Sequence, residues 1–112
     1  MNNLSPITNE ERDFIRTWCS DRYIDDIYTV RSILYWIRIR HKISYSWVLR
    51  KENKYLYMIL CIHISLKFDG YDELHYCDFF KDLKEILPTL DKNSHFNMEF
   101  EILSNLDWNL GY

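Results

Sequence analysis

A nearly continuous apolar run, the twelve residues from Tyr55 to Leu66, limits the possible folds of this chain more than any other feature. Apart from tyrosine hydroxyls, its polar side chains are those of His63 and Ser65. The run is too short to span a bilayer, which takes about 20 apolar residues. Because it is apolar nearly all round, we expect a helix over residues 52–68 that other helices surround.

The composition favours helices and a single domain. Apolar residues make up 47% of the 112 residues and charged residues 28%, which is typical of one globular core. Two glycines and two prolines leave little turn chemistry for a β-sandwich or barrel. We therefore predict an all-α fold, a single five-helix domain over residues 1–112 with a central, buried third helix. The expected helices cover about 8–22, 25–42, 52–68, 73–87 and 94–106.

Local signals support these ranges. Thr8 and Glu11 have the spacing of a capping box, the Asp69-Gly70 pair ends the third helix, and the fourth stops before Pro88. At helical spacing, one face of each outer helix is expected to point inward. These faces are, in chain order, Phe14, Ile15 and Trp18 with Arg22 at the edge; Ile27, Val30, Leu34, Ile37 and His41; Leu74, Cys77, Leu83 and Ile86; and Phe96, Phe100, Leu103 and Leu106.

Three motifs follow one another in a familiar order. Arg12 precedes Trp18 by six residues, the segment 64–68 reads ISLKF, and Met98-Glu99 leads to LDWNL at 106–110. This order resembles the cyclin box, a five-helix domain whose third helix is wrapped by the others. It is most similar to single-box cyclins of the yeast phosphate-regulating class. The chain also lacks Ala and Gln and is rich in Ile, Asn, Lys and Tyr, a bias typical of AT-rich genomes such as those of large DNA viruses or parasites.

Two positions depart from the cyclin pattern. The family usually has an Asp in the second helix that pairs with the first-helix Arg, and the matching position here is Ile37, which leaves Arg12 without that partner. Some cyclins bind substrate peptides in a hydrophobic groove that has Met where this chain has Glu11. The residues that would still supply the floor of such a docking groove are Phe14, Ile15 and Trp18.

The resemblance implies a partner-binding edge. Lys67, near the end of the third helix, and Glu99, at the start of the fifth, would hydrogen-bond the backbone of the regulatory helix of a cyclin-dependent kinase. The alternative is that the two side chains pair only with each other. The aromatic residues expected to add binding energy around them, or alternatively to be core or rim side chains, are Tyr55, Tyr57 and Phe96.

The function that follows is regulation by binding. The chain, either a monomer or part of a heterodimer, would bind a kinase of the cyclin-dependent class and favour the active kinase conformation. A decoy that occupies the kinase or another cyclin partner without activating it would use the same face. The sequence has no phosphate-binding loop, nucleophile elbow or metalloprotease motif, so we expect no enzymatic activity and no cofactor.

A basic sector spans residues 31–54, with seven basic residues and one acidic residue, on a chain whose net charge is −3. Cyclin folds also occur in proteins like general transcription factor IIB, which bind nucleic acid through basic helix faces. A nucleic-acid-binding or adaptor module is therefore the competing interpretation, and a solvated helix face is the simpler one. The residues of the predicted basic patch are Arg38, Arg40, Lys42, Arg50, Lys51 and Lys54.

Cysteine and histidine usage predicts neither disulfides nor metal. Three widely spaced cysteines form no disulfide framework, which favours an intracellular location in the cytoplasm or nucleus. Cys61-x-His63 and His75-x-Cys77 have residues two apart, about 200° around a helix, so neither pair converges on one ion. No secretory signal or membrane segment is expected.

Overall fold

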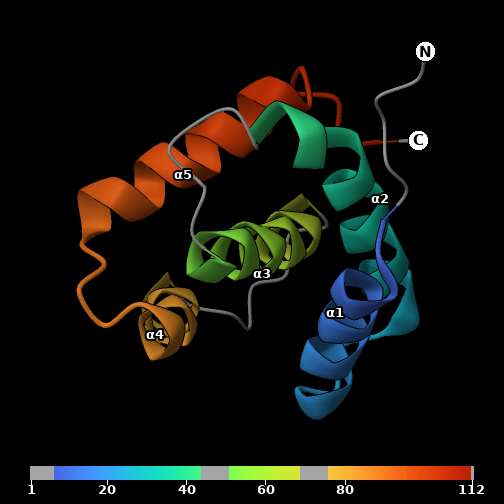
Figure 1. Cartoon of the computed structure of the whole chain (residues 1–112), viewed down its shortest axis with the longest axis horizontal. Coiled ribbons are helices and arrows are strands. Elements are labelled where there is room, and N and C mark those ends of the chain that lie inside the picture. Colours follow the sequence, from blue (N-terminus) through green and yellow to red (C-terminus); the bar gives the residue numbers. More distant parts are fainter. Residues whose placement is uncertain (1–6, 44–50, 69–75, 112) are drawn as a thin grey trace.

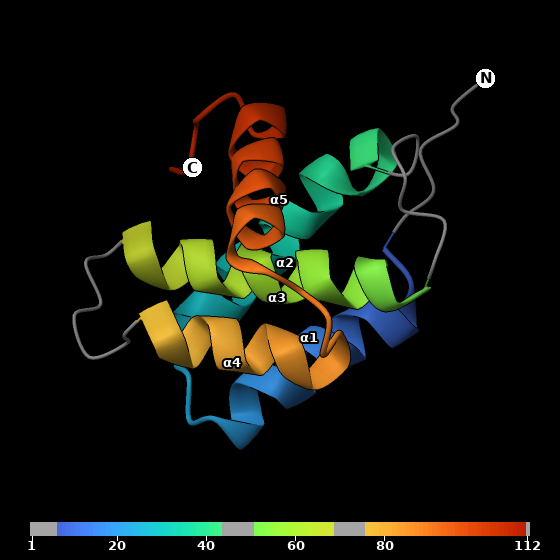
Figure 2. The same cartoon turned by 90° about the vertical axis from the view of Figure 1, so that its left-hand side faces the viewer.

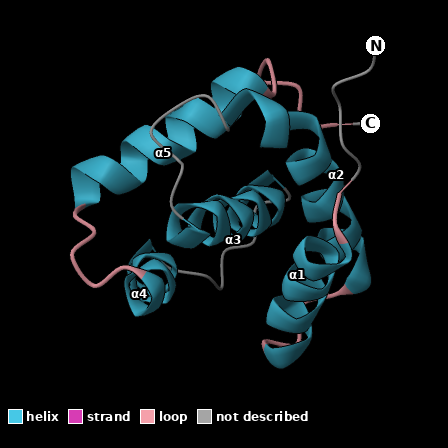
Figure 3. Cartoon of the chain, in the orientation of Figure 1, coloured by secondary structure: helices cyan, strands magenta, loops and turns pink. Residues whose placement is uncertain are grey.

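The computed structural model describes residues 7–43, 51–68 and 76–111. Within these ranges it has five helices and no strand, which confirms the all-α prediction (Figures 1 and 3). The predicted ends of the helices agree with the observed ones to within two residues, and the predicted start of the fourth helix, residue 73, lies outside the described residues. The helices are α1 (Asn9–Asp21), α2 (Asp26–Ile43), α3 (Lys51–Phe68), α4 (Tyr76–Ile86) and α5 (Lys92–Asn105).

Helix α3 is the centre of the domain, as predicted. The side chains of residues 56–66 are all buried. The other four helices surround α3. Helix α2 packs on one side of α3 and α4 packs on the opposite side, while α5 crosses α3 from above and α1 lies below it (Figures 1 and 2). A helix that is apolar all round needs neighbours on every side, and the four outer helices provide them.

Side-chain caps fix the first turns of α1 and α5. In α1 the predicted capping box is present: Thr8 Oγ1 accepts from the Glu11 backbone N–H, and Glu11 Oε1 accepts from the Thr8 backbone N–H. In α5 the Asp91 carboxylate accepts from the Ser94 backbone N–H at 2.7 Å. Each cap satisfies backbone N–H groups that have no partner within the helix.

The inward face predicted for α2 is wrong. Ile27, Val30, Leu34 and Ile37 are exposed, and the fifth predicted member, His41, has a side chain outside the described ones. Helix α2 turns a different face to the core, which includes Ser32, Tyr35, Trp36 and Ile39. The aromatic side chains on this face bury more area than the aliphatic stripe would.

Hydrogen bonds reinforce this orientation of α2. The Tyr35 hydroxyl donates to the carbonyl oxygen of Leu110 at 2.6 Å, and Ser65 Oγ of α3 donates to the carbonyl oxygen of Tyr28 at 3.3 Å. Burying a polar group costs free energy unless it finds such a partner. The face with Tyr35 is thus the one whose polar atoms the fold satisfies.

The prediction for α5 is half correct. Leu106 is buried and Leu103 is half-buried, as expected, but Phe96 and Phe100 point outward. Their places in the core are taken by His95, Met98 and Ile102 on the opposite face of the helix.

The inward faces predicted for α1 and α4 agree with the structure where it describes them. In α1, Ile15 is buried and Phe14 and Trp18 are half-buried, and in α4 Leu83 and Ile86 face inward. Leu74 and the side chain of Cys77 lie outside the described part of the chain.

Candidate functional site

The two charged residues expected at the docking edge, Lys67 and Glu99, form an ion pair. Nζ of Lys67 lies 3.0 Å from Oε2 and 3.2 Å from Oε1 of Glu99. The Lys67 side chain is 40% exposed and that of Glu99 is 18% exposed. Both groups therefore lie at one edge that solvent reaches, where the last turns of α3 pass α5 (Figure 2).

The expected position of Glu99 at the start of the fifth helix is wrong. Helix α5 begins at Lys92, so Glu99 lies seven residues, or about two turns, further along. The favourable effect of a helix N-terminus on a carboxylate fades within the first turn. The partner that balances the charge of Glu99 is therefore Lys67 rather than the end of its own helix.

Two buried histidines lie beneath this edge. Nε2 of His95 is 3.8 Å from Oε2 of Glu99, and Nε2 of His63 is 3.8 Å from Oδ2 of Asp82 on α4. Burial lowers the pKa of His63 to about 4, against the opposing effect of Asp82, and burial also lowers the pKa of His95, against the opposing effect of Glu99. Both imidazoles are therefore neutral at pH 7, and Lys67 carries the positive charge at the edge.

Exposed aromatic side chains border the ion pair on α5. Phe96 is 53% exposed and Phe100 is 60% exposed, and residues four apart share one face of a helix. Trp108 is also exposed and packs edge-on against Phe100, with ring centroids 5.6 Å apart. Sequence patterning placed both phenylalanines on the inward face of the fifth helix, although Phe96 was also a candidate for partner binding.

A further exposed aromatic residue follows Lys67 directly. Phe68 ends α3, and the guanidinium of Arg31 lies 5.1 Å from the centre of its ring. Exposed aromatic rings close to charged groups are typical of protein-binding surfaces. We call Phe68, Phe96, Phe100 and the Lys67–Glu99 pair the docking edge.

The two tyrosines predicted for this surface lie elsewhere. Tyr57 is completely buried and its hydroxyl donates to Glu101, so it is a core residue and not an exposed anchor. Tyr55 is half-buried near the start of α3, twelve residues before Lys67, a distance of about 18 Å along the helix axis. Its hydroxyl donates to Glu10 and its ring packs against Phe14 at 4.7 Å.

The residues of the predicted docking groove are close together, but they form an aromatic cluster. Phe14 stacks on Trp18 with centroids 5.9 Å apart, and the Arg22 guanidinium lies 3.3 Å from the centre of the Trp18 ring. Ile15 is completely buried beneath them. Because Arg22 covers Trp18, this ring is less accessible to a peptide than the sequence suggested.

Two cations of the predicted basic patch hold the end of α5. Arg38 donates to the carbonyl oxygens of Leu106 and Asn109, at 2.9 and 2.8 Å, and Lys42 donates to that of Asn105 at 3.0 Å. Carbonyl groups at a helix C-terminus have no partner within the helix and attract cations. These two side chains thus have a structural role within the domain.

Two further cations of the patch neutralise Glu11, whose side chain is almost completely buried. Nη2 of Arg40 lies 3.0 Å from Oε1 of Glu11, and Nζ of Lys54 lies 3.7 Å from its Oε2. Arg50 and the side chain of Lys51 lie outside the described part of the chain. Each of the four described patch residues therefore has an internal acceptor, which leaves less positive charge for a phosphate backbone.

The two cysteines whose side chains the structure describes are both buried. Burial raises the pKa of the Cys61 thiol and that of Cys19, so neither forms a reactive thiolate at neutral pH. Among the described residues, no three His, Cys, Asp or Glu side chains are placed to hold a metal ion, and no helix is both long and apolar enough to cross a membrane. The His75 member of the second Cys/His pair lies outside the described range.

Comparison with known proteins gives no relative: no protein-family model, no curated protein and no solved structure matches this chain. The likeness to the cyclin box therefore consists of the motifs around Arg12, Lys67 and Glu99 together with their order along the chain.

Proposed function

We propose that this chain is a cyclin-like regulatory protein that binds a kinase of the cyclin-dependent class through the docking edge. The observation that supports this most strongly is the Lys67–Glu99 ion pair, which is open to solvent and bordered by exposed phenylalanines. The pairing itself also fits the alternative, in which the two side chains bond only to each other. The exposed phenylalanines on the same helices are what favour docking, because apolar burial supplies most of the binding energy.

The charged pair would supply the hydrogen bonds of the interaction. Lys67 has three N–H donors and Glu99 has only acceptors, so the pair offers both kinds of hydrogen bond to the backbone at the end of a partner helix. Such charge-assisted bonds are stronger than bonds between neutral groups. Phe96 and Phe100 would lie against the apolar face of the same partner helix.

The effect on the kinase would be a shift in its conformational equilibrium. A protein that binds the active arrangement of the regulatory helix better than the inactive one increases the active population. That helix carries a residue needed to orient ATP for phosphoryl transfer. This chain would then act by binding alone, without catalysing a reaction itself. A decoy would occupy the same kinase surface and leave its activity low.

The competing proposal, a nucleic-acid-binding or adaptor module, receives less support. It needs basic side chains that reach phosphates, whereas Arg38 and Lys42 are bonded to the end of α5 and Arg40 and Lys54 lie against Glu11. A filter-binding titration at low salt addresses this alternative directly, because binding to phosphates strengthens steeply as salt falls.

The test of the kinase proposal is capture of an identified kinase by variants of the docking edge. The wild-type chain should retain a cyclin-dependent-class kinase from lysate, and Lys67→Ala with Glu99→Ala should abolish retention while helical circular dichroism stays unchanged. Lys84→Ala with Glu85→Ala, an exposed pair on α4, is the matched control and should bind normally. Equal capture by both double variants, or no kinase with the wild type, would refute the proposal. Kinase activity in the captured complex separates an activator from a decoy.

A further inference from the structure

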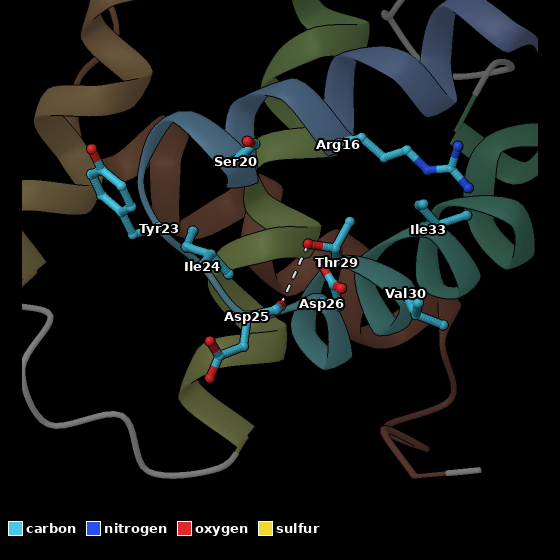
Figure 4. A pocket seen from close by; sticks show the side chains of 9 residues that line it. All are labelled: Arg16, Ser20, Tyr23, Ile24, Asp25, Asp26, Thr29, Val30 and Ile33. Atoms are coloured by element: carbon cyan, nitrogen blue, oxygen red, sulfur yellow. Dashed lines mark hydrogen bonds between the residues drawn. The ribbon is translucent and has the colours of Figure 1, made fainter.

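Two histidines are buried between α3 and the helices that pack against it. His63 of α3 is 2% exposed and His95 of α5 is completely buried. The hollow of about 800 Å³ between α1 and α2 differs, because its charged side chains, Arg16, Asp25 and Asp26, are open to water (Figure 4). A change of charge has its largest effect where water cannot screen it, and histidine is the side chain that changes charge in mild acid.

One oxygen atom of Glu99 faces two basic groups. Oε2 of Glu99 lies 3.0 Å from Nζ of Lys67 and 3.8 Å from Nε2 of His95, which is one turn earlier on α5. The exposed fraction falls along this row, from 40% for the Lys67 side chain through 18% for Glu99 to 0% for His95. The carboxylate therefore lies between a cation that water can solvate and an imidazole that water does not reach.

The charged and titratable groups that act on His95 come from its own helix and from α3. Glu99 of α5 attracts a proton to it, while Lys67 and His63 of α3 oppose a positive charge there. Behind them, Asp82 of α4 lies against His63. Burial lowers the pKa of His95, Glu99 opposes this and Lys67 adds to it, so the imidazole becomes charged in mild acid.

A proton on His95 would change the interactions of Glu99. A buried imidazolium is costly unless an anion pairs with it, and the Glu99 carboxylate is already beside it. Charge-assisted hydrogen bonds are also shorter than the present 3.8 Å separation, so pairing needs a movement of the carboxylate toward the core. Lys67 can accept the loss of its partner, because its ammonium group reaches water.

We propose that His95 is an acid-sensitive switch of the docking edge: a proton on its imidazole draws the Glu99 carboxylate inward and releases Lys67 to solvent. This inference rests on the proposed function of the docking edge as a partner-binding surface. Glu99 supplies the hydrogen-bond acceptor of that edge, so its movement toward the core removes the acceptor from the partner helix. Binding is then strongest at neutral pH and weakens as His95 becomes charged.

The aromatic part of the docking edge should stay in place. The ring of His95 stacks on that of Phe96, with centroids 5.6 Å apart and an angle of 13° between the planes. A cation is attracted to the face of an aromatic ring, so a charge on His95 does not repel Phe96. The switch therefore acts on the Lys67–Glu99 pair and not on the exposed rings.

His63 provides a matched control. Its Nε2 lies 3.8 Å from Oδ2 of Asp82, and that oxygen lies 3.9 Å from Nε of Arg22, so it too has a carboxylate between a buried imidazole and a more exposed cation. Neither Asp82 nor Arg22 belongs to the docking edge. Removing the imidazole of His63 should therefore leave the acid response of Lys67 unchanged.

A pH titration of the full chain by NMR tests the switch without a kinase. The Cε1–H signal of His95 reports its protonation, and the Nζ signal of Lys67 reports its ion pair. Both should change with one midpoint in the wild type, and the Lys67 signal should keep this transition in His63→Gln. In His95→Gln the Lys67 signal should change only at about pH 4, where carboxylates take up protons.

Three results overturn the proposal. The first is a wild-type Lys67 signal that does not follow the His95 midpoint, and the second is a His95→Gln chain whose Lys67 signal changes as in the wild type. The third is loss of helical circular dichroism before His95 becomes charged, because the fold would then open instead of switching.

Kinase capture connects the switch to docking. One pH unit below the His95 midpoint about nine in ten chains carry the proton, so wild-type affinity should be about tenfold weaker than that of His95→Gln for the same kinase. At pH 7 the two chains should bind alike. Equal affinities at the lower pH overturn the proposal. A wild type that captures no kinase at pH 7 refutes the proposed function alone, and the NMR titration then decides whether the switch exists.

Discussion

Arg40 of α2 and Glu11 of α1 form an ion pair with an N–O distance of 3.0 Å, and the carboxylate is almost completely buried. The cyclin pattern usually has a link of opposite polarity, between an Arg that matches Arg12 and an Asp that matches position 37, and the sequence lacks that Asp. Residue 37 is an exposed isoleucine. An ion pair thus links the first two helices at positions other than 12 and 37, and Glu11 also completes the cap of α1.

Removing the Glu11 carboxylate should destabilise the domain. Glu11→Ala leaves Arg40, whose side chain is 14% exposed, without its anion, and breaking a buried pair in this way costs about 3–5 kcal/mol. Glu11→Gln should cost less, because the amide oxygen can still accept from the Thr8 N–H. Urea unfolding gives the free energies. Asp13→Asn, an exposed change on the same helix, is the control, and a similar loss in all three variants would contradict the burial argument.

Arg38, two residues before Arg40 on α2, should also matter, because it donates to carbonyl groups that follow α5. Arg38→Met keeps the aliphatic stem but removes the donors to Leu106 and Asn109, and charged hydrogen bonds contribute about 1.5–3 kcal/mol each when shielded from water. We expect a loss of roughly 1–3 kcal/mol and faster proteolysis after α5. Arg16→Met, an exposed position on α1, should leave both unchanged. Equal stability of the two variants would show that these bonds are dispensable.

Mild acid should destabilise the fold through His63. Its folded pKa of about 4 lies below the unfolded value of 6.5, so the unfolded chain binds more protons between these values. The free energy of unfolding is therefore highest above pH 6.5, where His63 is neutral in both states, and it decreases as the pH falls toward 4. Between pH 7 and pH 5 the loss is about 2 kcal/mol, and His95 acts in the same direction.

Urea unfolding at pH 7 and pH 5 measures this effect for the wild type and for His63→Gln. The variant should lose about 2 kcal/mol less than the wild type between the two pH values, whatever its absolute stability. The lowered pKa of Asp91 contributes only at more acidic pH, below the range compared. An unchanged pH dependence in His63→Gln would show that another group carries it.

The helices were predictable because their signals are local. The capping box at Thr8 and the apolar run at 55–66 fix the first and third helices without reference to the rest of the chain. The orientation of α2 was not predictable from spacing, because both of its faces are apolar. The choice between them depends on distant partners, such as the Leu110 carbonyl that accepts from Tyr35.

Part of the candidate site was predictable from the sequence and part was not. Lys67 and Glu99 are adjacent as expected, although 32 residues separate them in the sequence. Tyr57 was misplaced because α3 is apolar on every side, so periodicity cannot tell which of its aromatic residues reach the surface. The basic sector looked like a binding patch, because a list of charges does not reveal the carbonyl groups and the buried Glu11 that it neutralises.

The exposed phenylalanines of α5 provide a final test that separates a docking surface from a core. Phe96→Asn with Phe100→Asn should change the free energy of unfolding by less than about 1 kcal/mol, because both side chains are more than half exposed. The same variant should lose kinase capture, because the apolar part of the docking edge is gone. By contrast, Ile102→Ala on the buried face of α5 should cost about 2–5 kcal/mol and leave capture intact wherever the chain remains folded. Strong destabilisation by the phenylalanine variant would instead place these rings in a structural contact and remove the main support for the docking edge.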